Sequence, residues 1–337
     1  MTRLHHHGRQ RSLALLGAAW LAAALPTAAQ TFKDPGLEAL YATDRTDELQ
    51  RVAAQRVAAQ ADDAQAVMAL ALAALDRDDA DARRHAIARA EACTSRQPRA
   101  APCQYALGVV LGIQAMTEGL FKAARSASTV RDALATAHQV EPAWWPARSA
   151  LMEFYLMAPG MMGGSSSKAA ELGRSAPRPE QARVIEARIA MNDRKFDAAL
   201  QALMALPPGL EPSLAADVRG WGTQAALGLV NEGQAARAQP WFERLMREQP
   251  GRADGAYGLA RVRGEAGDHA AAVRLYEQAQ GLKGAQAWPI GYRLGQSLQQ
   301  LGRVDEARGA YRRFVATGKG PQRALDDAKE RLEQLGG

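Results

Sequence analysis

A glycine-rich stretch that runs into serines and a lysine, from Gly160 to Lys168, has the residue types of a phosphate-binding loop. In a nucleotide cradle the pattern G-x-x-x-x-G-K-[ST] follows a strand, and the loop N–H groups and the lysine hold the phosphates. Counted from Gly160, the sixth position here is Ser165 rather than a glycine, and an alanine follows Lys168. The preceding segment, 144–157, has the pattern of a helix. The sequence therefore excludes a nucleotide cradle and predicts an enlarged turn, 158–167, between two helices.

Residues that could form a catalytic or metal site are scattered along the chain rather than clustered. Beyond residue 29 the histidines are His85, His138 and His269. Apart from His85 and Cys93, two helical turns apart, none has a second His or Cys at a spacing that zinc sites use. We expect each to be a solvated or helix-face histidine. The sequence predicts no catalytic residue, no metal site and no cofactor.

Two further motifs match a known site in letters but not in context. Residues 220–225 fit the dinucleotide fingerprint G-x-G-x-x-A, which works only between a strand and a helix, whereas this copy lies inside a predicted helix. Residues 76–84 hold four closely spaced aspartates, but Asp81 stands where a calcium loop needs its glycine. We interpret the acidic run as a solvated turn that caps a helix.

The chain has two cysteines, Cys93 and Cys103. Exported proteins meet oxidising conditions, so a disulfide between them is expected. The alternative is a pair of free thiols. A metal site is disfavoured, because no histidine lies at a suitable spacing beside both cysteines.

The first 29 residues have the layout of a secretory signal peptide. Three arginines precede the apolar run Leu13–Leu25, and small residues follow, with cleavage expected between Ala29 and Gln30. The alternative is a retained membrane anchor, but a helix needs roughly 20 apolar residues to span a bilayer, and this run has 13. We expect a periplasmic protein without a stable membrane span, with secretion as the second possibility.

The charge balance argues against a nucleic-acid partner. The full chain has 42 Lys and Arg against 36 Asp and Glu, and loss of three leader arginines leaves 39 against 36. Nucleic-acid binders of this size normally carry a clear basic excess clustered on one surface. We therefore expect a protein or peptide partner.

The elements that must position any site are helices. Apolar residues recur at spacings of three and four along most of the chain, and alternating strand patterns are rare. A small–aromatic–small pattern repeats in the C-terminal half: segments 233–245, 267–279 and 302–314 start 34 and 35 residues apart. A repeat of this length is typical of stacked helical hairpins. Its small residues are Ala238, Ala272 and Ala307, each followed one turn later by Phe242, Tyr276 and Tyr311.

Residues 180–316 resemble tetratricopeptide repeats in period and signature, which implies an all-α fold, a right-handed α-solenoid of tetratricopeptide-type helical hairpins. The best copies are 219–252, 253–286 and 288–318, and 180–213 is a degenerate copy. Departures from the family pattern are Ala256, where an aromatic is usual, and Gly284, where a proline is usual. The pattern FYLxAPGxxGGxxxKA also resembles one in other exported bacterial repeat proteins.

The expected organisation follows from this resemblance and from the leader. It is a signal peptide at 1–29, an N-terminal segment with the first helix at 30–61, degenerate hairpins at 62–179, the repeat array at 180–318, and a capping helix at 319–337. Within the degenerate half, residues 104–128 are expected to form one long helix. Ser166 or Ser167 is expected to cap the helix after the enlarged turn.

The resemblance implies a non-catalytic scaffold that binds a peptide or protein segment on its concave face. That face is lined in the family by fixed positions of the first helix of each repeat. They correspond here to Thr223, Asn231, Asp254, Tyr257, Arg261, Glu265, Tyr292, Gln296, Gln299 and Gln300.

The enlarged turn is a second candidate contact. Its residues are Pro159, Gly160, Met161, Met162, Gly163 and Gly164, with Lys168 just beyond. Two adjacent methionines in such a turn must either pack back on the helices or meet a partner. The alternative function is an enzyme of unrecognised type with a site near 150–170, which would need a pocket there with converging carboxylates or a buried histidine.

Overall fold

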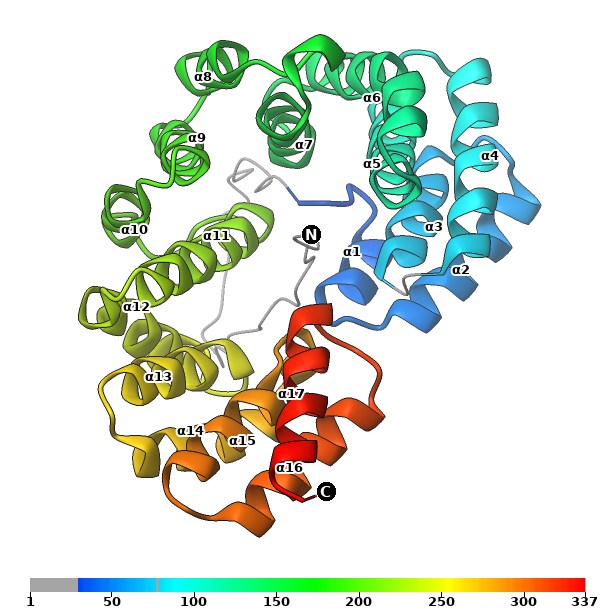
Figure 1. Cartoon of the computed structure of the whole chain (residues 1–337). Helices are drawn as coiled ribbons and strands as arrows, with labels where there is room; N and C mark the ends of the chain where they lie inside the picture. Colours follow the sequence, from blue (N-terminus) through cyan, green and yellow to red (C-terminus); the bar gives the residue numbers. More distant parts are fainter. Residues whose placement is uncertain (1–29, 77–78, 337) are drawn as a thin grey trace, which may run out of the picture. The chain divides into compact units, whose positions relative to one another are not determined.

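The computed structural model describes residues 30–76 and 79–336 and is helical throughout that part of the chain, with no strand (Figure 1). The predicted signal peptide lies outside the described residues. The chain divides into two compact units. Unit 1 comprises the described residues up to Asp193 together with Ala205–Val218, and unit 2 comprises Arg194–Met204 and Arg219 onward.

Unit 1 is a series of helices in which neighbours in sequence pack together. They are α1 (Pro35–Ala42), α2 (Thr46–Ala59), α3 (Ala64–Asp76), α4 (Ala80–Arg96), α5 (Ala101–Glu118), α6 (Leu120–Val140), α7 (Trp145–Met157), the 3-10 turn η1 (Gly160–Met162), α8 (Ser166–Arg174) and α9 (Pro179–Asn192). The segment 30–61, expected to hold the N-terminal segment and the first helix, contains two helices, because a turn at Asp44, with a φ of 54°, separates α1 from α2.

The long helix expected over 104–128 is also two helices. Gly119 has a φ of 92°, a left-handed value that ends α5 after Glu118. The chain then reverses into α6, which continues to Val140, and α5 and α6 pack against each other along their length. The apolar periodicity continues on both sides of Gly119, so the periodicity does not reveal where α5 ends and α6 begins.

Two local predictions for unit 1 are confirmed. Asp79 caps α4, and its side chain accepts hydrogen bonds from the N–H groups of Asp81 and Ala82. Cys93 on α4 and Cys103 on α5 form a disulfide with a Cα–Cα distance of 5.7 Å. Both cysteines are fully buried, so the bond ties the two helices together inside the core of unit 1.

Unit 2 contains the regular repeats. Its helices are α10 (Phe196–Met204), the second part of α11 (Pro212–Asn231), α12 (Ala235–Glu248), α13 (Ala253–Glu265), α14 (His269–Gln280), the 3-10 turn η2 (Ala285–Ala287), α15 (Ile290–Gln300), α16 (Val304–Ala316) and α17 (Gln322–Gln334). Helix α11 starts at Pro212, seven residues before the predicted start of the first regular repeat at 219, and its residues 212–218 belong to unit 1. The C-terminal helix α17 buries Ala324, Leu325 and Ala328 in the core of the unit.

The small–aromatic–small pattern allows facing helices to pack closely. Ala238, Ala272 and Ala307 are completely buried. On the facing helices, glycines allow the aromatic rings to approach: a Cβ on Gly258 would lie 2.0 Å from the Phe242 ring, and one on Gly222 would lie 2.1 Å from the Trp241 ring. Gly222 belongs to the G-x-G-x-x-A motif, so that motif serves helix packing here and is not a nucleotide-binding turn.

Candidate functional site

The predicted groove residues of unit 2 are largely inside its core. Thr223, Asp254, Tyr257 and Arg261 are only 2 to 7% exposed, so the prediction that these four side chains line an open surface is wrong. Tyr257 is covered because η2 lengthens the turn between α14 and α15. That turn lets the Trp288 ring stack on the Tyr257 ring, with 4.9 Å between centroids.

The polar groups of this set are used within the unit. The Thr223 hydroxyl accepts a hydrogen bond of 3.3 Å from the Trp241 indole. The Arg261 guanidinium donates to the Asn231 side chain at 2.9 Å and pairs with Glu265 at 3.7 Å. The contacts of Thr223 and Asn231 join α11 to α12 and α13, whereas the Arg261–Glu265 pair lies within α13, so these side chains stabilise the repeat.

The C-terminal members of the predicted groove form a second internal network. The Gln296 amide donates to the Tyr292 hydroxyl at 2.8 Å. The Gln299 carbonyl accepts from the Tyr311 hydroxyl and from Arg331 on α17, both at 3.1 Å. Gln300 and Glu265 are exposed. Partner binding by the exposed or half-buried members stays a prediction.

The enlarged turn of unit 1 has a defined conformation. The chain leaves α7 at Met157, forms η1, and enters α8 after Ser165, whose hydroxyl accepts from the Lys168 N–H. The cap is therefore Ser165 and not Ser166 or Ser167. The backbone N–H of Ser165 donates to the Tyr155 carbonyl at 2.8 Å, which closes the turn.

Two glycines make this closure possible. Gly163 has a φ of 97°, and its Cα lies against the side chains of Arg131 and Phe154. At Gly164 a Cβ would lie 1.7 Å from the Ala158 carbonyl oxygen, so no side chain fits there. The turn holds Met161 outward, at 93% exposure, while Met162 is half-buried.

Replacing Gly164 with alanine is expected to destabilise unit 1 by about 2 kcal/mol, because backbone atoms must move to admit the Cβ. The measurement is the thermal unfolding midpoint, combined with limited proteolysis between α7 and α8, which should become faster. Gly160→Ala is the matched control, since a Cβ there meets nothing within 4 Å. Equal behaviour of the two variants would contradict a closed turn.

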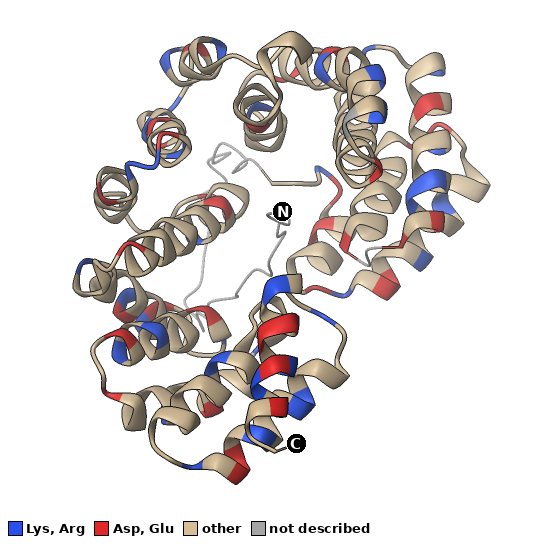
Figure 2. Cartoon of the chain, in the orientation of Figure 1, with Lys and Arg blue, Asp and Glu red and all other residues tan. Residues whose placement is uncertain are grey.

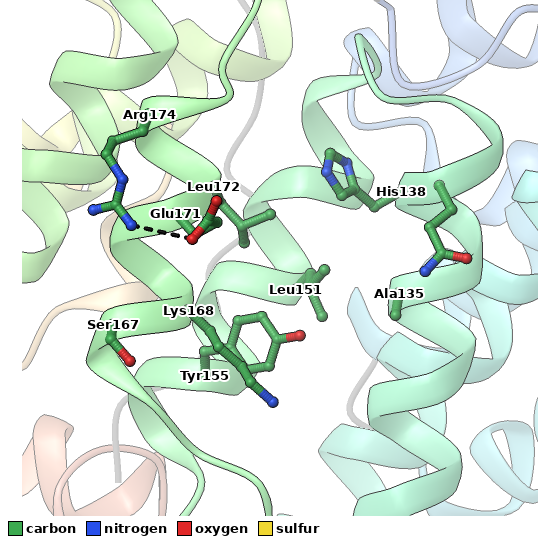
Figure 3. Close-up of a pocket in the computed structure, with 10 residues that line it drawn as sticks. Ala135, His138, Leu151, Tyr155, Ser167, Lys168, Glu171, Leu172 and Arg174 are labelled. Carbon is green, nitrogen blue, oxygen red and sulfur yellow. Dashed lines mark hydrogen bonds and ion pairs between the residues drawn. The ribbon is translucent and has the colours of Figure 1, made fainter.

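A pocket of about 320 Å³ lies beside this turn, between α6, α7 and α8 (Figure 3). Apolar and polar side chains line it together: Ala135, His138, Gln139, Leu151, Tyr155, Ser167, Lys168, Glu171, Leu172 and Arg174. His138 and Ala135 come from α6, while Lys168, Glu171 and Leu172 face them from α8. All of these residues belong to unit 1.

His138 is the residue that sequence reasoning missed. It is half-buried rather than solvated, and within the described chain its Nδ1 has no hydrogen-bond partner. Burial lowers the pKa of His138 to about 4, and the positive charge of Arg148 adds to the shift. The imidazole is therefore neutral at physiological pH. No sequence pattern signals this, because Arg148 lies on the next helix.

The charged groups of the pocket leave one cation without a carboxylate. Glu171 and Arg174 pair with each other at 3.1 Å. The Lys168 ammonium lies 5.6 Å from the centroid of the Tyr155 ring and makes no ion pair with any described residue. Burial raises the pKa of the Tyr155 hydroxyl, which keeps it protonated. The pocket thus offers a positive charge, hydroxyl groups and apolar walls.

The low pKa of His138 predicts a pH-dependent stability. Between its folded pKa of about 4 and its unfolded value of 6.5, the unfolded chain binds more protons, so stability falls as pH drops through this window. After discounting for partial exposure, we expect wild type to lose about 1–2 kcal/mol more than His138→Gln between neutral pH and pH 4.5. Urea unfolding of both proteins at the two pH values measures the difference, and parallel losses would contradict it.

Other chemistry-bearing groups do not converge. Glu171 is the single carboxylate among the pocket residues. Across residues 30–76 and 79–336, no three His, Cys, Asp or Glu side chains are grouped so as to hold a metal ion. In the same part of the chain, no helix combines the length and apolar character needed to cross a membrane.

Comparison with known proteins identifies the fold. No protein-family model and no curated protein matches the chain. Among solved structures, the human IFIT1 dimer with PPP-AAAA is similar with a TM-score of 0.54 and 14% identity over 81% of this chain and 63% of that one. A monomeric IFIT1 mutant with Gppp-AAAA gives a TM-score of 0.55 and 13% identity over 89% of this chain and 69% of that one.

Yeast Tom70 gives a lower TM-score, 0.46, with 11% identity over 90% of this chain and 75% of its own. The chain spans 63% of the length of the first of these structures. At such low identities the similarity establishes the fold alone. The fold class predicted from the repeats is confirmed: the protein is an all-α solenoid of tetratricopeptide-type helical hairpins.

Proposed function

We propose that this protein is a non-catalytic helical-repeat scaffold that binds a segment of a partner protein. We place the binding surface on unit 1, at the turn after α7 and the pocket between α6, α7 and α8, rather than on the first helices of the regular repeats. The observation that carries this choice is the exposure of Met161, at 93%, on a turn that two glycines hold closed. Met157, at the end of α7, is also 42% exposed, and exposed apolar side chains that form a contiguous patch mark interaction sites.

The contrast with unit 2 supports the placement. There several of the predicted contact residues are buried or hydrogen-bonded to neighbouring helices, as for Tyr257 and Gln299. In unit 1 the pocket walls contain Lys168, which makes no ion pair with a described residue and only lies over the Tyr155 ring, and the His138 Nδ1, which has no hydrogen-bond partner within the described chain. A ligand can use such groups without first breaking contacts that stabilise the fold.

We also propose that the protein works in the periplasm after removal of the leader. The leader pattern of residues 1–29 supports export. The Cys93–Cys103 disulfide is consistent with an oxidising compartment, where such bonds persist.

Site-specific photo-crosslinking tests the proposed surface. A photoreactive amino acid at Met161 is expected to give a discrete protein adduct in cells, which mass spectrometry would identify. The control position is Arg312 on α16, which is also exposed but lies in unit 2. Adducts of the same kind at both positions, or none at Met161, would overturn the proposal.

Catalysis is the second candidate, because the pocket is lined by Leu151, Tyr155 and Lys168 from the region 150–170 and contains half-buried His138. We favour binding because Glu171, the single carboxylate of the pocket, is paired with Arg174. A general acid–base mechanism usually needs a titratable group with a pKa near the working pH, and that of His138 is about 4. Turnover of ester or phosphate-ester substrates that His138→Ala abolishes would favour the enzyme.

The ligands of the IFIT1 structures raise nucleic acid as a competing partner. We propose a protein partner instead, since basic and acidic residues are nearly balanced in number and are interspersed along the helices of each unit (Figure 2). An electrophoretic shift of single-stranded RNA that Lys168→Glu abolishes would reverse this choice.

A further inference from the structure

The α6 helix continues the proposed binding surface beyond the pocket. At 3.6 residues per turn, Phe121, Ser128, Arg131, Ala135 and Gln139 fall within a sector of about 80° around α6. Ala135 and Gln139 line the pocket, and Arg131 lies against Gly163 of the enlarged turn. Phe121 therefore lies on the same side of the helix as the pocket and the turn. We call this sector, with Met161 and Lys168, the α6 track.

The track has exposed apolar side chains at two points. Phe121 is 91% exposed at the start of α6, and Met161 is 93% exposed on the turn. Met157, the last residue of α7, is 42% exposed beside that turn. From Phe121 to Ala135 the helix rises about 21 Å, which is the length of roughly six extended residues. A short polypeptide segment matches this distance.

The charges along the track are positive on balance. Arg131 is paired with Asp132, and Arg174 with Glu171. Arg125, one turn from Phe121, and Lys168 make no ion pair with any described residue. Behind the pocket, the buried Arg148 guanidinium bonds to carbonyl and hydroxyl oxygens rather than to a carboxylate. Its field reaches the pocket, where it contributes to the lowered pKa of His138.

We propose that the α6 track binds an acidic segment of the partner protein, with a carboxylate at Lys168 and a large apolar side chain against Met161. This inference rests on the proposed function and specifies the chemistry of its partner. Arg125 and Lys168, which make no ion pair with a described residue, and the buried Arg148 attract negative charge. A partner that covers the exposed side chains of Phe121 and Met161 removes apolar surface from water, which stabilises the complex. Anionic lipid offers a similar charge, but the pocket beside Lys168 is a concave site for a side chain, which favours a polypeptide.

The test starts from a random dodecapeptide library panned on the purified chain. The enriched peptides should contain more Asp and Glu than the starting library and at least one large apolar residue. Their affinities, from fluorescence anisotropy, should fall at least about tenfold for Lys168→Glu and about fivefold for Met161→Ser. Raising NaCl from about 50 to about 500 mM should weaken binding several-fold.

Lys319→Glu is the matched control, because it makes the same charge change at an exposed lysine of unit 2. It should leave the affinity within about twofold of wild type. Peptides without acidic enrichment, peptides that bind Lys168→Glu as tightly as wild type, or no enriched peptide at all would each overturn the inference. Binding to phosphatidylglycerol vesicles that Met161→Ser abolishes, without peptide selection, would assign the track to lipid instead.

The binding scaffold and the acidic character of its partner can be rejected separately. A protein adduct at Met161 together with neutral selected peptides would retain the binding scaffold and reject the acidic partner. Absence of both the adduct and the peptides would reject the scaffold proposal as well.

Discussion

Replacing Arg148 with methionine is expected to lower the free energy of unfolding of unit 1 by about 3 kcal/mol. Arg148 is 1% exposed on α7. Its guanidinium donates to the carbonyl oxygens of Pro142, Leu172 and Ser175, and to the Ser175 hydroxyl. It thereby satisfies the C-terminal carbonyl groups of α8 and the turn before α7. Methionine fills a similar volume but leaves these acceptors without donors.

Thermal unfolding gives the measurement. For a unit of this size, about 3 kcal/mol corresponds to a fall in midpoint of roughly 6–12 °C. Arg148→Lys should recover only part of the loss, because one ammonium cannot reach all four oxygens in the geometry of a planar fork. Arg174→Met is the control: Arg174 is exposed and pairs only with Glu171, so its loss should cost less than about 0.5 kcal/mol. Equal shifts for Arg148→Met and Arg174→Met would show that the buried guanidinium does not stabilise α8.

The repeats of unit 2 were predictable from sequence because each depends on local spacing. Ala272 and Tyr276 are one helical turn apart, and both are buried as the pattern predicts. The break at Gly119 was not predictable in the same way. Apolar periodicity runs through it, and a single glycine within a helix pattern is compatible with continuation. Gly119 ends α5 with its left-handed φ, and the packing of α6 back onto α5 accompanies this reversal.

The proposed binding surface was only partly predictable, because contacts between helices define its environment. The enlarged turn stands out because proline and glycine interrupt a helical pattern, and the structure places Met161 outward there. The burial of Tyr257 depends on Trp288, which lies 31 residues later on a lengthened turn. The environment of His138 depends on Arg148 from the next helix. Contacts between helices decide both cases, and a single sequence does not encode them as a local pattern.

The family resemblance assumes a standard turn length, which does not hold throughout unit 2. In unit 2, residues 281–289 separate α14 from α15, which is longer than the short turns of regular hairpins. The Lys283 N–H donates to the Gly251 carbonyl, and its carbonyl accepts from Ala253, so this turn is tied to the preceding one. Trp288 is thereby placed over the Tyr257 ring.

The second large effect is expected in the core of unit 2, from Gly258→Ala on α13. The added Cβ would lie 2.0 Å from the ring of Phe242, which is completely buried and cannot swing into solvent. Overpacking of a core by one methyl group costs about 1–3 kcal/mol when neighbours can adjust. Because a whole ring must shift here, we expect about 3 kcal/mol despite the higher helix propensity of alanine. Urea or thermal unfolding of the purified chain measures the loss.

Gly264→Ala, on the same helix, separates the packing effect from helix propensity. A Cβ at Gly264 meets its nearest neighbours only at 4.0 Å, so this variant should be more stable than wild type by about 0.5–1 kcal/mol. Adding Phe242→Leu to Gly258→Ala should cost less than the sum of the two single changes, because the smaller side chain makes room for the methyl group. Additive losses would mean that the ring of Phe242 is not what excludes a side chain at position 258. The close approach of α12 and α13 would then have another cause than the pairing of glycine with an aromatic ring.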